Sequence, residues 1–224
     1  MDRYPNSVVS SGVRTSALST NKVLRNTYLL LGATLLFSAL MAGVSMALKL
    51  PSFGLFTILI YFGLLFAVTK TQNSSWGILW TFALTGFLGF TLGPILNLYL
   101  TALPNGSQIV MTALGTTAIA FLGLSAYAIK SERDFSFMGG FLMIGAIGAF
   151  VLGLVAYFFN MPTLSLVVSG LFLIVSGGLM LWQTSAIIRG GETNYISATV
   201  TLYVSIYNMF LSLLHILGVS SSDD

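Results

Sequence analysis

Apolar residues in this chain gather in seven long runs separated by short polar connectors. The runs cover residues 27–48, 52–69, 77–100, 109–129, 137–159, 164–188 and 195–218. A helix rises ~1.5 Å per residue, so runs of this length can cross a hydrocarbon core of ~30 Å with modest tilt. The pattern predicts an all-α integral membrane protein, a bundle of seven transmembrane helices that occupies residues 27–218.

The segments outside the runs are short and polar. Residues 1–26 are rich in Ser, Thr and Asn, which predicts a disordered N-terminal tail that leaves room for a basic juxtamembrane helix near Lys22 and Arg25. The first run is too long for the apolar core of a cleaved signal peptide, so we expect it to be retained as a helix. Residues 219–224 form a short C-terminal tail. No connector is long enough for a soluble catalytic domain.

Cations mark one side of the predicted bundle. With a cytosolic N-terminus, eight of the nine Lys and Arg residues fall on the cytosolic side and only Lys49 falls on the other. The positive-inside rule therefore predicts a cytosolic N-terminus and, after seven spans, an outward-facing C-terminus. The cations are scattered between apolar runs without a basic stripe, which argues against nucleic-acid binding. Charged residues make up only 7% of the chain, too few to cover the surface of a soluble domain. Cysteine is absent, which excludes disulfides and thiolate chemistry.

The last run carries a polar stripe. Its members are spaced three or four residues apart and so share one helix face: Ser197, Thr201, Ser205, Asn208, Ser212 and His215. Lipid offers these groups no hydrogen bonds, so we expect this helix to be enclosed by the others. Gln183 in the sixth run lies at a similar depth to Ser205. The stripe of the last run, together with Gln183, predicts either interhelical hydrogen bonds or a hydrated polar path.

The third run contains a candidate helix break. Gly89 and Gly93 allow another helix to approach closely, and Pro94 removes a backbone donor. Asn97, one turn further on, needs a polar partner inside the bundle. Packing is the simpler interpretation. A transporter that uses the break would lack a membrane-embedded charge to couple to.

Catalysis and metal binding find little support in the sequence. No carboxylate lies inside a run, so His215, the one histidine, has no partners for a metal. An intramembrane serine hydrolase would need Ser125 and His215 in contact, yet their runs place them ~20 Å apart in depth. We therefore expect a protein that is not an enzyme, with no cofactor and no metal, and His215 as a hydrogen-bonded packing residue.

Four short sequence motifs carry information that composition does not. FLGFTLGPILN, RDFSFMGG, GGETNYI and LYVSIYNMF begin at residues 87, 133, 190 and 202, and together they resemble the transmembrane Bax inhibitor motif family. Within that family the chain is similar to the bacterial YccA-like branch, including residues 18–26. The resemblance implies a last helix surrounded by the other six.

The resemblance also implies two functions. Proteins of the YccA-like branch associate in the bacterial inner membrane with the ATP-dependent protease FtsH and its companions HflK–HflC, as substrate and as a brake. Here the tail, with Arg14, Lys22 and Arg25, would be the part that the protease engages. Other members are pH-sensitive calcium leak channels that use two buried aspartates on the last two helices. This chain has Gln183 and Ser205 at those positions, and neither ionises, so they would instead hydrogen-bond and hold the path shut.

Overall fold

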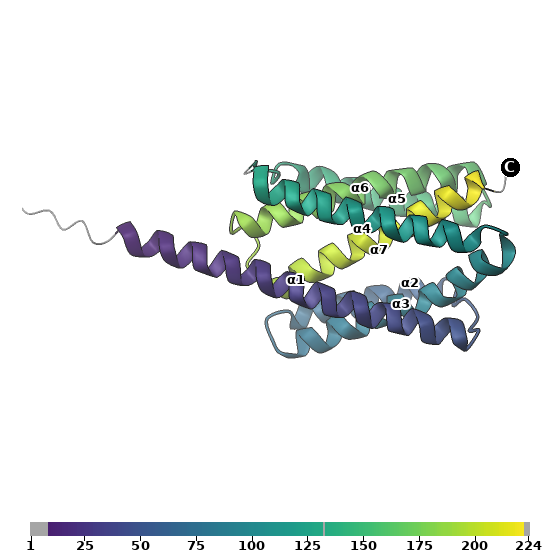
Figure 1. Cartoon of the computed structure of the whole chain (residues 1–224), viewed down its shortest axis with the longest axis horizontal. Helices are drawn as coiled ribbons and strands as arrows, with labels where there is room; N and C mark the ends of the chain where they lie inside the picture. Colours follow the sequence, from purple (N-terminus) through teal and green to yellow (C-terminus); the bar gives the residue numbers. More distant parts are fainter. Residues whose placement is uncertain (1–8, 132, 222–224) are drawn as a thin grey trace, which may run out of the picture.

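The structure, a computed structural model, describes residues 9–131 and 133–221. This part of the chain folds into seven helices and no strand, as the apolar runs predict (Figure 1). Their bounds are α1 Val9–Ala47, α2 Phe56–Thr71, α3 Trp76–Ala102, α4 Gly106–Ser131, α5 Met138–Phe158, α6 Pro162–Ile188 and α7 Tyr195–Ser220. Six of them are long and apolar enough to cross a membrane, and α2, with 16 residues, is shorter.

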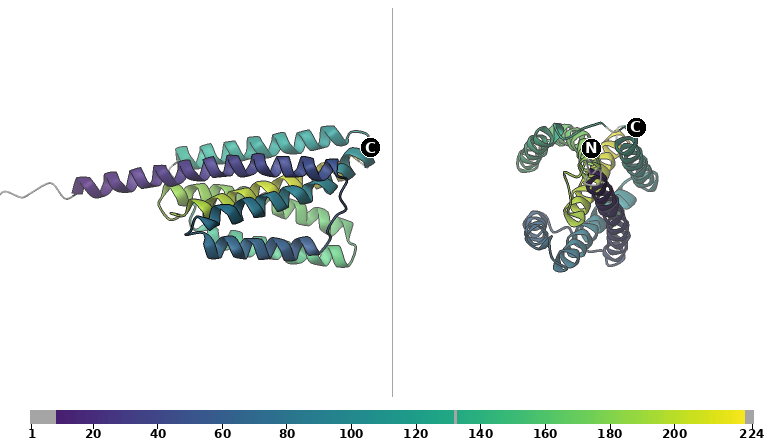
Figure 2. Two further views of the ribbon diagram at one scale, coloured as in Figure 1. Left: turned by 90° about the horizontal axis from the view of Figure 1, so that it is seen from below. Right: turned by 90° about the vertical axis from the view of Figure 1, so that its left-hand side faces the viewer.

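The first helix begins earlier than the composition predicted. We expected residues 1–26 to be disordered with room for a juxtamembrane helix near Lys22 and Arg25, but α1 runs without interruption from Val9. Residues 1–8 lie outside the described part. Because Ser and Thr cost a helix only a few tenths of a kcal/mol each, an apolar helix can extend into a polar segment that lacks proline and has a single glycine. The N-terminal part of α1 therefore projects beyond the bundle as a helix (Figures 1 and 2).

The last helix crosses the middle of the bundle. It contacts α1, α3, α4 and α6, whereas α2 packs on α3 and α5 packs on α6 (Figure 2). No residue of α7 from Tyr195 to Val219 is exposed, which confirms the enclosure that its polar stripe predicted. α1, α3, α4 and α6 make the closest backbone contacts with α7. α2 and α5 lie further out, and side chains of α2 such as Val68 and Tyr61 share a core cluster with α7.

Small residues bring α1 and α3 together. A Cβ added at Gly89 would overlap the backbone of Ser38, and one added at Gly93 would overlap the side chain of Ser45. These glycines therefore allow the close approach that their spacing predicted. On α1 the facing residues also repeat every three or four positions and are all buried: Thr27, Leu31, Thr34, Ser38, Ala42 and Ser45.

The predicted break at Pro94 is absent. The proline lies inside α3, which is a single helix from Trp76 to Ala102. Neighbouring helices and local adjustment allow membrane helices to tolerate proline, since the freed carbonyl does not have to face lipid. The structure therefore gives no opening in α3 that would expose its backbone to a cavity.

The glycine contacts lead to a prediction about stability. Gly89→Ala places a methyl group against the Ser38 backbone, which cannot move aside as a flexible side chain would. We expect a loss of about 1–3 kcal/mol, the usual cost of overpacking a core. The measurement is the free energy of unfolding in mixed detergent micelles. Gly115→Ala in α4 is the control, because nothing lies within 4 Å of its added Cβ, and an equal loss in both variants would contradict the account.

Candidate functional site

The polar stripe of α7 satisfies much of its own hydrogen bonding. The Ser205 hydroxyl donates to the Thr201 carbonyl at 2.8 Å, and the Thr201 hydroxyl donates to the Ser197 carbonyl at 3.1 Å. Ser205 and Ser212 are buried and Asn208 is half-buried. Since serine and threonine can bond to the carbonyl one turn back, these positions do not require a hydrated path.

The structure does not join Gln183 to Ser205. Gln183 is only 1% exposed, and its side-chain nitrogen Nε2 has no hydrogen-bond partner among the described residues. Ser205 already donates within its own helix. The expected lock between these two side chains is therefore not formed.

His215 makes one polar contact, to the neighbouring helix α6. Its Nδ1 lies 2.7 Å from the Ser169 hydroxyl, which in turn donates to the Ser165 carbonyl at 3.1 Å. The tautomer of the imidazole ring decides which of the two groups donates in this contact. The histidine ties α7 to α6, as a packing residue would.

A tyrosine on α7 forms the most connected polar contact in the core. The Tyr203 hydroxyl lies 2.5 Å from the Ser38 hydroxyl on α1 and donates to the Thr85 carbonyl on α3 at 3.1 Å. Tyr203 is 1% exposed. We call these three residues the tyrosine node. They join three helices at the centre of the bundle, where water is not available to replace a lost bond.

Further hydrogen bonds join α1, α3 and α7 to one another on either side of the tyrosine node. Tyr207, one turn further along α7, bonds to the Thr91 hydroxyl on α3 at 3.0 Å. The Thr199 hydroxyl donates to the Thr27 carbonyl on α1 at 3.2 Å. Asn97 donates to the Met46 carbonyl at 3.1 Å, which confirms that this amide finds a partner inside the bundle.

Sequence reasoning missed the tyrosine node because tyrosine was counted as an apolar residue in the runs. The α1 face offered a signal, however. Thr27, Thr34, Ser38 and Ser45 lie seven, four and seven residues apart, which places four hydroxyl groups on one helix face. Such a face predicts contact with protein in the same way as the stripe on α7 does.

One end of the bundle gathers most of the positive charge. The loops after α2, α4 and α6 meet there, and α1 projects past them (Figure 1). We call this the cationic end, and its described cations are Lys22, Arg25, Lys70, Lys130, Arg133 and Arg189. Lys22 and Arg25 are exposed on α1, whereas the side chain of Arg14 falls outside the described part.

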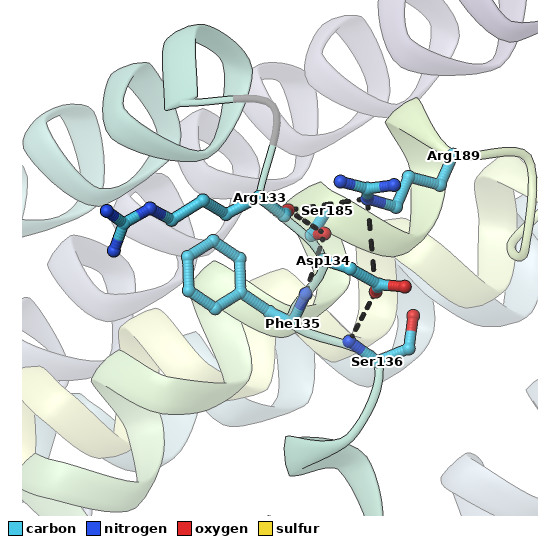
Figure 3. A network of polar contacts seen from close by, with 6 residues as sticks. All are labelled: Arg133, Asp134, Phe135, Ser136, Ser185 and Arg189. Carbon is cyan, nitrogen blue, oxygen red and sulfur yellow. Dashed lines mark hydrogen bonds and ion pairs between the residues drawn. The ribbon is translucent and has the colours of Figure 1, made fainter.

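The loop after α4 is tied to the end of α6 (Figure 3). The Arg133 carbonyl accepts hydrogen bonds from Ser185 Oγ and from Arg189 Nε, both at 3.3 Å. The Asp134 carboxylate accepts from the Ser136 backbone amide at 2.8 Å and lies 3.9 Å from Arg189 Nε. Hydrogen bonds from Ser136, with a smaller contribution from Arg189, hold the pKa of Asp134 below its usual value.

The loop before α7 is tied to the loop after α2. Asn194 caps α7, since its side-chain oxygen accepts from the backbone amides of Ile196 and Ser197. Its side-chain nitrogen donates to the Gln72 carbonyl at 3.0 Å and to Asn73 Oδ1 at 2.8 Å. The RDFSFMGG and GGETNYI strings thus supply residues that hold the cationic end together.

This arrangement of six long apolar helices and one shorter apolar helix, with loops tied at a charged end, is that of a multi-pass membrane protein. The chain belongs to the family described as "Inhibitor of apoptosis-promoting Bax1", whose model matches residues 20–222. It is 52% identical over the full length of both chains to the Modulator of FtsH protease YccA from Escherichia coli K12. It is also 51% identical to an uncharacterized protein of Pseudomonas aeruginosa, over 90% of this chain and 91% of that one. A Vibrio cholerae membrane protein is 48% identical over 92% and 93% of the two chains.

The two roles of Asn194 can be separated by substitution. Asn194→Ala removes both the cap of α7 and the bonds to residues 72 and 73, and we expect a loss of about 1–2 kcal/mol in the free energy of unfolding from the cap alone. Asn194→Asp keeps the capping oxygen but cannot donate to the Gln72 carbonyl, so its loss should be smaller. Thermal unfolding in detergent measures both. Equal losses in the two variants would show that the cap contributes nothing.

Proposed function

We propose that this chain is an inner-membrane modulator of the ATP-dependent protease FtsH, engaged through its N-terminal segment. The full-length similarity to a protein named for that role supports the partner. The observation that carries the proposal is the projection of α1 past the cationic end (Figure 1). Its residues 9–26 span about 27 Å as a helix. A processive protease needs such an accessible end to begin.

The orientation follows from the charges. The cationic end faces the cytosol under the positive-inside rule, so the projecting part of α1 lies on the side where an ATPase has nucleotide available. Seven spans then place the C-terminus in the periplasm. We expect HflK–HflC to accompany FtsH, as the family resemblance implies.

A role without catalysis fits the geometry of the contact between Ser169 and His215. The serine hydroxyl also bonds to the Ser165 carbonyl of its own helix at 3.1 Å, as serines inside membrane helices commonly do. The backbone amides around Ser169 lie inside α6, where they bond to carbonyls of their own helix. No oxyanion hole is then available beside this serine.

The first test is purification of the chain from its native membrane in mild detergent, with identification of the proteins that accompany it. Deleting residues 2–20 removes most of the projecting part of α1 and leaves the bundle from Thr27 onward. We expect FtsH to accompany the full chain and to be lost from the truncated one. A matched control replaces residues 2–20 with the same residues in scrambled order. Equal capture of FtsH by the full and truncated chains would contradict engagement through this segment.

A cation leak is the second candidate, and the buried Gln183 Nε2 without a partner is the observation that favours it. A carboxylate pair that changes charge with pH is absent, because Gln183 and Ser205 do not ionise. Replacing both residues with Asp should therefore create calcium flux that depends on pH in liposomes, whereas flux through the parent chain should not depend on pH. If calcium flux depended on pH in the same way in both proteins, a path controlled by the residues at positions 183 and 205 would be contradicted.

A further inference from the structure

The helix that the protease would pull first is also bonded to its neighbours at several points along its length. Bonds from α3 and α7 reach α1 at three depths: the Thr27 carbonyl near the cationic end, the Ser38 hydroxyl in the middle and the Met46 carbonyl near the far end. Ser38 lies 11 residues after Thr27 and 8 before Met46, so these bonds are spread over about 28 Å of helix. A force that pulls the N-terminus along the helix axis therefore acts on all three bonds at the same time rather than on one after another.

The packing around these bonds resists sliding. Gly89 and Gly93 of α3 lie so close to Ser38 and Ser45 that an added Cβ would overlap α1 at either position. The ring of Phe37 lies against Gly86 in the same way. Since side chains of α1 project into these gaps, α1 cannot translate along its axis until α3 moves away from it.

The tyrosine node links the attachment of α1 to both α3 and α7. One hydroxyl bonds to Ser38 on α1 and to the Thr85 carbonyl on α3, so extraction of α1 breaks a bond that also positions α7. Hydrocarbon provides no replacement donor or acceptor while α1 leaves. The protease must therefore supply the free energy that separates the Ser38 and Tyr203 hydroxyls.

We propose that α1 is a mechanical clamp, and that the Ser38–Tyr203 bond sets the rate at which the engaged protease can extract the chain. The inference rests on the proposed function for its partner. The projecting part of α1 lets the protease begin, and the clamp then slows the next step. A chain that is engaged quickly and extracted slowly occupies the protease, which is how it would act as a modulator rather than as an ordinary substrate.

Two substitutions weaken the clamp by removing one oxygen each. Ser38→Ala deletes the α1 partner, and Tyr203→Phe deletes the shared hydroxyl. We expect degradation by purified FtsH, in proteoliposomes with ATP, to accelerate about 3- to 20-fold. This range corresponds to the average and the largest values measured for single interhelical hydrogen bonds in membranes.

Each variant has a matched control in the same helix. Thr34→Val removes a buried hydroxyl of α1 that donates to carbonyls of its own helix, at 2.9 and 3.0 Å. Tyr207→Phe removes an α7 hydroxyl that bonds to Thr91 on α3 rather than to α1. Both controls should be degraded at the rate of the parent chain. Acceleration of the controls equal to that of the clamp variants would overturn the proposal, because it would show a general loss of stability.

A second measurement separates this proposal from the identity of the partner. The parent chain in a supported bilayer is pulled from its N-terminus with a force probe, and the lifetime of α1 under constant load is recorded. Ser38→Ala and Tyr203→Phe should shorten that lifetime about 3- to 20-fold, and the two controls should not. Unchanged lifetimes would refute the clamp even if FtsH binds, whereas shortened lifetimes without any FtsH binding would refute only the proposed partner.

Discussion

The bundle depends on how polar groups find partners where water is absent. Each membrane helix satisfies its backbone internally, so specific attachment between helices rests on packing and on a few side-chain hydrogen bonds. In this protein the tyrosine node supplies such bonds to three helices through one hydroxyl. Without it, α7 would keep the single bonds that Thr199, Tyr207 and His215 make to one neighbouring helix each, but it would lose the bond that joins it to α1 and α3 at one point.

The same constraint distinguishes the helices by their contacts. α1, α3 and α7 form a closely packed unit with glycines and hydroxyls at its contacts, and α4 and α6 pack on α7 beside it. α2 and α5 form an outer layer that presents large apolar side chains such as Phe62 and Phe141. The tied loops at the cationic end keep this unit from opening where α1 leaves it. A rigid bundle with one projecting helix suits a protein that is grasped but resists removal.

Much of the fold could be predicted from the pattern of apolar runs. The seven helices, the enclosed last helix and the close approach at Gly89 follow from run length, polar spacing and small residues. The projecting part of α1 could not be predicted, because composition alone does not show that a polar segment continues a neighbouring helix. The tyrosine node was also missed, since Tyr203 gives the same apolar signal whether it faces lipid or a serine on another helix. The bond expected between Gln183 and Ser205 is also missing: the Ser205 hydroxyl donates to the Thr201 carbonyl within α7, and Gln183 Nε2 has no partner among the described residues.

The central claim is that the protease meets this chain at the projecting part of α1. The most direct measurement is photo-crosslinking in native membranes from a benzophenone side chain that replaces Lys22, which is exposed near the cationic end. The comparison places the same side chain at Lys49, which is exposed in the loop that follows α1. The account predicts crosslinks to FtsH from position 22 and none from position 49. Crosslinks from position 49, or from neither position, would contradict it.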